Sequence, residues 1–320
     1  MSRYLLRRII MLVPTMLLLL LLVVVMVRLI PGDIVDILLQ EQGGQGSEKA
    51  KVDRQQLEDR LGIGSPLPVQ YVSYLGGLLR GDLGRSLWDR RPVRDMIKDR
   101  FPVTAEVALI AIFFSVLAAI PVGVISAVKQ DTAPDYLLRS ISVLGISTPG
   151  FAIGTAIVIF PTLWWGWAIS FRYVSFVDDP ITHLRLIGPP AAVLGIQLSA
   201  SVARMTRTMM LEVMQEDYVR TARAKGLTNF RVVMRHALRN ALIPVVTVLG
   251  LQVTFLIGGS VITESIFALP GLGRLLLEAI SERDYPVVQG IVVVVGLLVM
   301  VTNLAVDISY GFLDPRVRYS

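Results

Sequence analysis

The sequence contains 320 residues, of which 53% are hydrophobic and 18% are charged, with a mean hydropathy of +0.63 and a formal net charge of +6. This balance is too apolar for a soluble domain of ordinary composition and places the chain in a bilayer. The absence of cysteine excludes a disulfide framework and a thiolate metal site, and the presence of only two histidines excludes a histidine-rich metal site.

The first apolar run extends from Ile9 to Ile30 and follows a basic N-terminus. A secretory signal peptide has the same order of charge and hydrophobicity, but this run is long enough to span and no A-x-A-like cleavage site follows it. We therefore expect residues 1–30 to form a retained first transmembrane helix.

Residues 31–101 separate the first span from the second and are predicted to form an extracytoplasmic loop or subdomain. The segment is longer than the loops in which basic residues report orientation, and its acids are about as numerous as its bases. Its Gly-rich portion at residues 43–49 is expected to be mobile. The sequence PVRDMIKDRF at residues 92–101 predicts a short surface helix before the second span.

Five further apolar runs follow in residues 102–320. A run of about 20 apolar residues can cross a ~30 Å hydrocarbon core as a helix, which satisfies its backbone polar groups internally. The sequence therefore predicts an all-α polytopic membrane protein with six transmembrane helices, near residues 9–30, 102–128, 136–165, 187–207, 240–263 and 286–309.

The connections between these spans are alternately rich and poor in basic residues, and this alternation indicates the orientation of the spans. One side receives the N-terminal arginines, Lys129 and Arg139 after the second span, and Arg316 and Arg318 in the tail. By the positive-inside rule we expect this side, and hence both termini, to be cytoplasmic, so the charge marks topology rather than a nucleic-acid partner. The same side receives the richest cluster, between spans four and five: Arg204, Arg207, Arg220, Arg223, Lys225, Arg231, Arg235 and Arg239.

Sequence motifs for catalysis are missing. No G-x-x-x-x-G-K-[ST] occurs, which excludes nucleotide binding by that route, and neither H-E-x-x-H nor G-x-S-x-G is found. Ionisable groups inside spans usually mark function, but Glu106 and Asp307 lie near the ends of spans two and six. We interpret both as interfacial carboxylates or as partners of a basic neighbour, and an intramembrane enzyme has no supporting set of residues.

Three uncharged polar residues lie deeper in the spans: Gln197, Gln252 and Asn303. Each could contact a substrate that passes between the helices, or form a hydrogen bond with a neighbouring helix. They are the candidate residues of a translocation pathway.

The connection between spans four and five, at about residues 208–239, predicts two helices and a turn. Its first part is rich in helix formers up to Lys225, and Gly226 suits a helix C-terminus because glycine takes left-handed dihedrals without steric cost. A second helical stretch is expected from about Asn229. The segment is either a basic loop held at anionic lipid headgroups or a helix whose small and apolar residues fit a groove on another protein.

The sequence DYVRTARAKGL at residues 217–227, followed by RHALRN at 235–240, resembles the coupling loop of binding-protein-dependent ABC permeases, in the dipeptide/oligopeptide/nickel branch. Ala222, Gly226 and Leu238 match the general pattern E-A-A-x-x-x-G followed by I-x-L-P. Ile34 replaces the proline that usually follows G-D in the family, and the Gly-rich insert is a second departure. Stretches similar to this branch extend over nearly the whole chain: RLIPGD at 28–33, PLPVQYVSYLGGLLRGDLGRS at 66–86, ALPGLGRLLLEAI at 268–280, RDYPVVQG at 283–290 and LDPRVR at 313–318.

The resemblance implies the fold of a type I ABC importer transmembrane domain, with residues 102–320 as the permease core. It implies that Ala222 and Ala224 permit close approach to an ATPase, and that Pro270, Gly271 and Gly273 of the PGLG turn form an outer gate. The residues that it assigns to ATPase coupling are Tyr218, Arg220, Thr221, Ala222, Arg223, Lys225 and Gly226.

The resemblance also implies partners, a location and a cargo. The expected partners are a homologous second permease, two ABC ATPase subunits that carry ATP and Mg²⁺, an extracytoplasmic solute-binding protein and the lipid of a bacterial or archaeal cytoplasmic (inner) membrane. This chain would bind no cofactor itself and would not be an enzyme. Short peptides are the expected cargo, with nickel, glutathione, opines or oligosaccharides as alternatives in the same branch. An ion-coupled carrier or a channel without an ATPase is an alternative of another class, and it would typically carry a charged group in mid-span.

Overall fold

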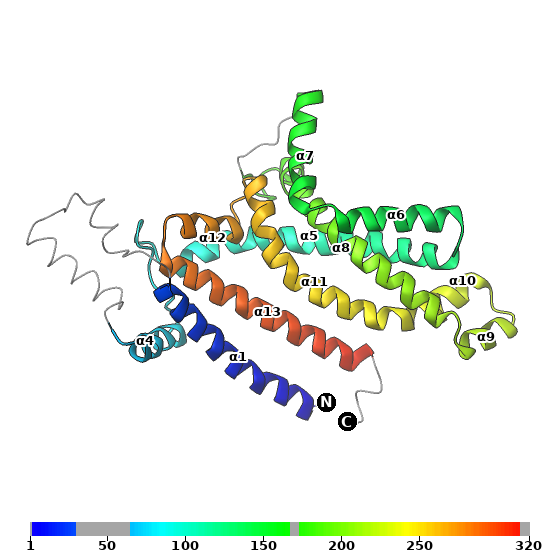
Figure 1. Ribbon diagram of the computed structural model, residues 1–320, viewed down its shortest axis with the longest axis horizontal. Helices are drawn as coiled ribbons and strands as arrows, with labels where there is room; N and C mark the ends of the chain where they lie inside the picture. The colour runs from blue at the N-terminus through cyan, green and yellow to red at the C-terminus, as the bar shows by residue number, and fades with distance from the viewer. Residues whose placement is uncertain (1, 30–64, 167–172, 314–320) are drawn as a thin grey trace, which may run out of the picture. The chain divides into compact units, whose positions relative to one another are not determined.

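The computed structural model describes residues 2–29, 65–166 and 173–313. These residues form the helices and connecting turns that Figure 1 shows, with one isolated bridge between Arg85 and Pro92. The predicted all-α class is therefore confirmed for the described residues.

Some of the sequence predictions fall outside this part of the chain. They concern the Gly-rich segment at residues 43–49, the departure at Ile34 and most of the tail motif LDPRVR.

The helices keep the labels of Figure 1, in which the numbering has gaps. In chain order they are α1 (Ser2–Leu29), α4 (Leu67–Leu79), α5 (Val93–Val128), α6 (Ala133–Ser147), α7 (Gly150–Trp165), α8 (Pro180–Val213), α9 (Asp217–Ala224), α10 (Asn229–Arg231), the π-helix η1 (Val232–Ala237), α11 (Leu238–Ile266), α12 (Leu272–Ser281) and α13 (Tyr285–Leu313).

Five stretches of helix are long and apolar enough to cross a membrane, and the pair α6 and α7 makes a sixth if it counts as one broken span. Counted in this way, they match the six predicted spans in number and in place. The five stretches are Arg8–Met26, Val93–Val128, Pro180–Val213, Asn229–Val253 and Tyr285–Ser309.

The prediction of one continuous third span at 136–165 is wrong, because α6 and α7 meet at an angle of 96°. Pro149 has no N–H to donate and disfavours a helical conformation at the residue before it. Thr148 accordingly has φ −86° and ψ 121°, which is extended backbone. The proline therefore divides the segment into two helices.

The prediction of a separate surface helix at residues 92–101 is also wrong, because α5 runs unbroken from Val93 to Val128. Pro102 removes one backbone donor, but buried side chains lie on both sides of it, at Val93, Ile97 and Val103. Their burial offsets the lost hydrogen bond, so the polar first turns and the second span form one helix.

Helix α8 begins seven residues before the predicted start of the fourth span, because a side chain caps it. Asp179 Oδ1 accepts hydrogen bonds from the N–H groups of Ile181 and Thr182, each at 3.1 Å, and Pro180 occupies the first helical position. Hydrogen bonds from the Thr182 side chain and N–H lower the pKa of the Asp179 carboxyl. This cap starts the helix in the polar stretch that precedes the apolar run.

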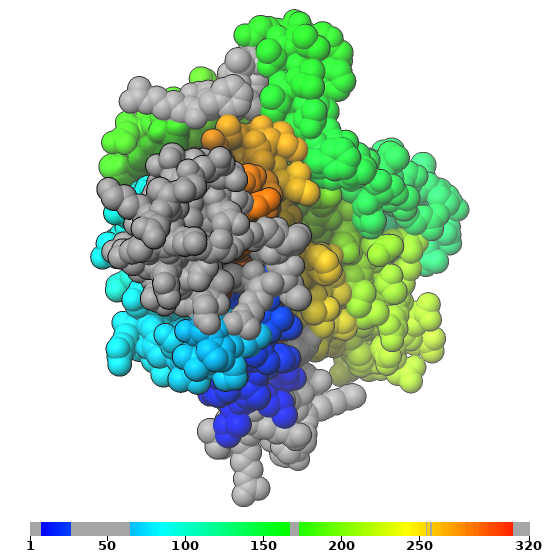
Figure 2. All heavy atoms as spheres, turned by 60° about the vertical axis from the view of Figure 1, so that its left-hand side comes forward, coloured from blue at the N-terminus to red at the C-terminus, as the bar shows by residue number. Residues whose placement is uncertain are grey.

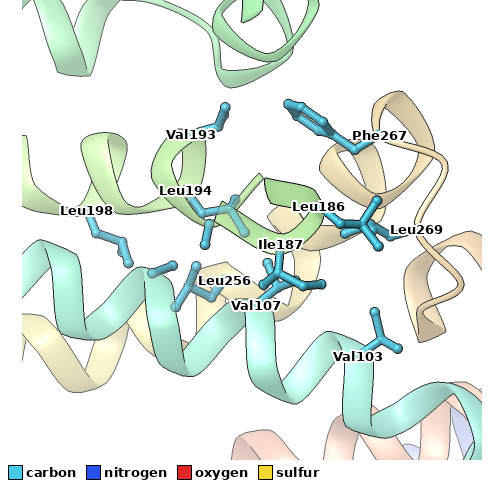
Figure 3. Close-up of a cluster of buried hydrophobic side chains, with 12 residues drawn as sticks. Val103, Val107, Leu186, Ile187, Val193, Leu194, Leu198, Leu256, Phe267 and Leu269 are labelled. Carbon is cyan, nitrogen blue, oxygen red and sulfur yellow. The ribbon is translucent and has the colours of Figure 1, made fainter. Parts of the chain in front are cut away.

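The described residues divide between two compact units, of which the first comprises Met1–Leu5, Arg100–Leu275 and Val301–Ser320. Its main core is shown in Figure 3, where side chains from α5, α8 and α11 and from the turn after α11 converge. A second cluster joins the end of α5, the end of α8 and the beginning of α11. Helices α5 and α8 therefore run in one direction and α11 runs in the opposite direction.

Helices α6 and α7 lie along the outside of this unit, where Figure 2 shows them in shades of green. They expose large apolar side chains, among them Leu137, Ile141, Phe151, Leu163 and Trp165. Contiguous apolar exposure of this kind is typical of a surface that faces lipid or another subunit.

The second unit comprises Leu6–Asp99 and Leu276–Met300. Tyr71 of α4 donates a hydrogen bond of 3.1 Å to the carbonyl oxygen of Leu17 in α1. Two glycines of α13 allow close approach of other helices, since a Cβ at Gly290 would meet Val93 and one at Gly296 would meet Leu19. These contacts join α1, α4, the start of α5 and α13.

Candidate functional site

The predicted coupling segment forms the short amphipathic helix α9. Val219 is fully buried and Ala222 is 7% exposed, and both pack against Val232 of η1. The exposed residues of α9 include Tyr218, Arg220, Thr221 and Arg223, and Lys225 follows directly after the helix. The expected second helical stretch begins at Asn229, as predicted.

Ala222 is buried within the chain itself, between Val219 and the neighbouring π-helix, and its expected role in close approach to an ATPase stays a prediction. Its small size lets α9 pack closely on η1. Ala224 is exposed, so its expected role stays a prediction.

Gly226 follows α9 in a left-handed conformation, with φ +78°. Its N–H donates to the carbonyl oxygen of Arg223 over 2.9 Å, which closes the last turn. No heavy atom lies within 4 Å of the position that a Cβ would take there. Glycine is therefore required by backbone conformation and not by space.

A polar contact that the sequence analysis missed joins α9 to the start of α11. The side-chain N–H of Asn240 donates to the hydroxyl oxygen of Tyr218 over 2.7 Å. Asn240 is the last residue of the motif RHALRN, but that motif alone does not indicate which side chain it meets.

The end of α8, which leads into α9, is tied to α6 by a buried ion pair. Arg207 Nη2 lies 2.8 Å from Asp135 Oδ2, and Arg207 Nε lies 2.9 Å from Oδ1. The hydroxyl of Ser126 in α5 also donates to Asp135. The predicted basic cluster thus contains one arginine whose role is structural and which is not a solvated charge.

Glu106 is partnered by a basic neighbour. His183 Nε2 lies 2.7 Å from Glu106 Oε1, and His183 Nδ1 lies 2.8 Å from the carbonyl oxygen of Val174. Because a carbonyl can only accept, Nδ1 carries a proton, and the imidazole bridges α5 to the segment before α8. The interpretation of Glu106 as a paired carboxylate is confirmed.

The three candidate pathway residues lie in different surroundings. Gln197 is half-buried in α8, where its amide group lies against Gly150 at the beginning of α7. Gln252 is half-buried in α11 and Asn303 is exposed on α13. Within the described part of the chain none of the three side chains forms a hydrogen bond, and their role in a pathway stays a prediction.

The predicted gate residues surround a buried carboxylate that the sequence analysis did not single out. Glu264 is fully buried, and a Cβ at Gly271 or Gly273 would meet its carboxylate. Thr104 Oγ1 donates to Glu264 Oε1 over 2.7 Å, and the N–H of Arg274 donates to Oε2 over 3.1 Å. Pro270 is half-buried in the turn that precedes them.

This arrangement makes the PGLG turn a packed structure. The carboxylate of Glu264 lies at the N-terminus of α12, where N–H groups without helical partners and the helix dipole favour a negative group. The turn is thereby fixed to α5 and to the end of α11, while its role as an outer gate stays a prediction.

A second buried carboxylate precedes α13. Asp284 accepts hydrogen bonds from the hydroxyl of Ser86, at 2.5 Å, and from the N–H of Leu87, at 3.2 Å. Burial raises the pKa of Asp284, against the opposing effect of these hydrogen bonds. The loop that contains Ser86 belongs to one of the motifs of the sequence analysis, and Asp284 belongs to another, RDYPVVQG.

The sequence was compared with known protein families and with known proteins. Residues 119–319 match the family model of the binding-protein-dependent transport system inner membrane component, and residues 1–108 match the model of its N-terminal region. The dipeptide transport system permease protein DppB of Escherichia coli strain K12 is 41% identical over 100% of this chain and 99% of its own length. The di/tripeptide transport system permease protein DppB of Pseudomonas aeruginosa strain UCBPP-PA14 is also 41% identical, over 100% of this chain and 99% of its own length.

Among solved structures, an inward facing conformation of the MetNI methionine ABC transporter has a TM-score of 0.57 to this chain. The match covers 68% of this chain and 96% of that chain, at 20% identity. At this identity the likeness concerns the fold alone, and it supports the predicted importer transmembrane-domain architecture.

Proposed function

The chain belongs to the family of binding-protein-dependent transport system inner membrane components, and from this membership we propose that it is a permease subunit of an ATP-driven importer of short peptides. Peptides are favoured over nickel, glutathione, opines and oligosaccharides because the relatives described above are named as dipeptide and di/tripeptide permeases. The observation that carries the proposal is the geometry of α9. It exposes polar residues while Val219 and Ala222 are buried, in the connection between two spans.

In this proposal the chain acts with separate subunits. A homologous second permease completes the translocation pathway, two ABC ATPase subunits bind ATP and Mg²⁺, and an extracytoplasmic solute-binding protein delivers the peptide. The permease binds no cofactor and has no catalytic site of its own. Both termini and α9 lie on the cytoplasmic side, and residues 31–101 lie outside.

The proposed mechanism is mechanical. Arg220, Arg223 and Lys225 on the exposed face of α9 would meet acidic groups in a cleft of the ATPase. Closure of the ATPase pair on ATP would displace α9, and the displacement would pass into the spans on either side of it, α8 and α11. Alternating access would follow from rocking of the two permeases against each other.

The buried contacts of the site support transmission as a rigid body. Val219 and Ala222 hold α9 on η1, which continues into α11, and Arg207 with Asp135 holds the end of α8 on α6. A packed and hydrogen-bonded element moves as a unit because its interior does not deform continuously.

The test is to purify the complex through a tag on this chain and to reconstitute it in liposomes. We expect a sister permease and an ATPase to copurify, and labelled dipeptide to accumulate only when ATP and the peptide-loaded binding protein are both present. Accumulation that is driven by a proton gradient in the absence of ATP would contradict the proposal and favour an ion-coupled carrier.

A further inference from the structure

The contact between Tyr218 and Asn240 spans the two elements that the proposed mechanism must connect. Tyr218 lies in the first turn of α9 and Asn240 lies in the first turn of α11. The side-chain N–H of Asn240 donates to the Tyr218 hydroxyl over 2.7 Å, and the same N–H group lies 3.5 Å from the carbonyl oxygen of His236. The amide group of Asn240 therefore contacts both α9 and the end of η1.

The contact between α9 and η1, the π-helix that continues into α11, is apolar. Val219 and Val232 are both fully buried, and Leu227 packs beside them. Apolar burial holds two surfaces together but is non-directional, so it resists separation more than it resists rotation or sliding. A hydrogen bond has a preferred distance and angle and so adds the directional restraint that the apolar contact lacks.

The other side-chain hydrogen bonds of α9 stay inside the helix, as far as the described residues extend. Thr221 donates to the carbonyl oxygen of Asp217 over 2.9 Å, and Arg220 lies 3.5 Å from the Asp217 carboxylate. Beyond α9 the chain continues through the left-handed Gly226. The Tyr218 hydroxyl is thus the polar group of α9 that fixes its rotation on α11.

We propose that Asn240 is a positioning residue for transport coupling, which sets the rotation of α9 on α11 through the hydroxyl of Tyr218. This inference rests on the proposed function, because it assigns the path by which a displacement of α9 reaches the span. With the hydrogen bond in place, a force on the exposed face of α9 moves α11. Without it, α9 slides on its apolar contact and part of the displacement is lost.

The test uses the whole reconstituted complex and measures two quantities at once, peptide transported and ATP hydrolysed. In Asn240→Ala and in Tyr218→Phe we expect the ratio of peptide to ATP to fall about three- to tenfold, which is the factor that one lost hydrogen bond is worth. Tyr218→Phe removes only one oxygen atom and so tests the contact if Asn240→Ala fails to assemble. Asn229→Ala, at an exposed asparagine at the start of α10, is the matched control and should keep the wild-type ratio.

Two further variants separate positioning from a general structural role. The double variant with both Tyr218→Phe and Asn240→Ala should be no worse than either single variant, because both remove the same bond. Asn240→Asp should have a higher ratio of peptide to ATP than Asn240→Ala, since the tyrosine hydroxyl can donate to a carboxylate. This gain should disappear when Tyr218→Phe is added.

The outcomes distinguish this inference from the function on which it rests. An unchanged ratio of peptide to ATP in both single variants, or additive losses in the double variant, would overturn the role of Asn240. The proposed function would remain supported if the wild type still shows ATP-driven uptake. Absence of ATP-driven uptake in the wild type would overturn both.

Discussion

Arg207 and Asp135 form a two-pronged ion pair in which the carboxylate is fully buried and the guanidinium side chain is 17% exposed. Arg207 lies near the end of α8 and Asp135 lies in the first turn of α6. The N–H of Asp131 also donates to this carboxylate, over 3.1 Å. The pair fixes the end of the helix that leads into α9. Because the carboxylate is buried, it would be strongly destabilising without its cation.

Replacement of Arg207 by alanine should destabilise the protein severely. It leaves a buried carboxylate without its cation, and loss of one partner of a buried pair typically costs about 3–5 kcal/mol. We expect a large fall in the melting temperature of the detergent-solubilised protein, measured by tryptophan fluorescence. Arg204→Ala is the control, because Arg204 is exposed on the same helix. Equal melting temperatures for the two variants would contradict the structural role of the pair.

Substitution of Gly226 should act through backbone conformation. At φ +78° a valine costs about 1–2 kcal/mol, whereas asparagine visits this region more readily. We therefore expect Gly226→Val to insert normally in the membrane but to lose most of its ATP-driven peptide uptake, and Gly226→Asn to retain most of it. Uptake in proteoliposomes is the measurement. Equal losses in the two variants would show that the added side chain, and not the dihedral, is responsible, although no neighbour lies within 4 Å.

Gly273 should not tolerate even a methyl group. A Cβ there would lie 2.9 Å from the backbone nitrogen of Val261 and 3.0 Å from Glu264 Oε2, and a backbone neighbour cannot move aside cheaply. We expect Gly273→Ala to lower the free energy of unfolding by about 1–3 kcal/mol. Gly258→Ala in α11 is the matched control, because no atom lies within 4 Å of its Cβ position, and it should be neutral or slightly stabilising. Thermal unfolding in detergent compares them, and the prediction fails if both variants melt alike.

Asp284 should make stability depend on pH. Burial raises the pKa of this carboxyl, so the folded state holds its proton to a higher pH than the unfolded state does. The contribution of this carboxyl to the free energy of unfolding is fully present below its pKa in the unfolded state, about 3.9. It is lost as the pH rises through its pKa in the folded state. Asp284→Asn cannot ionise, so the melting temperature of the variant should improve relative to the wild type between about pH 4 and pH 7. A difference that stays constant over this range would contradict the raised pKa.

Local and periodic signals in the amino-acid sequence were sufficient to predict the positions of the spans and of the turn at Gly226. Apolar runs of the length of a bilayer located the six spans, and the glycine at position 226 marked the turn between two helices. These signals are local because a spanning helix satisfies its own backbone, and because a left-handed residue favours glycine wherever it occurs. The stretch at residues 217–227 that resembles a coupling motif could be recognised for the same reason, since its residues are contiguous in the chain.

Which side chains contact one another depends on the packing of the folded chain. Asn240 and Tyr218 are separated by 22 residues, Arg207 and Asp135 by 72, and Glu264 and Thr104 by 160. Each pair depends on how helices pack, which the periodicity of any one helix does not specify. The same holds for Ala222, whose packing with Val219 and Val232 the motif does not indicate. The chemistry of a polar residue in a membrane helix is set by its neighbours, because a buried polar group is stable only with a partner.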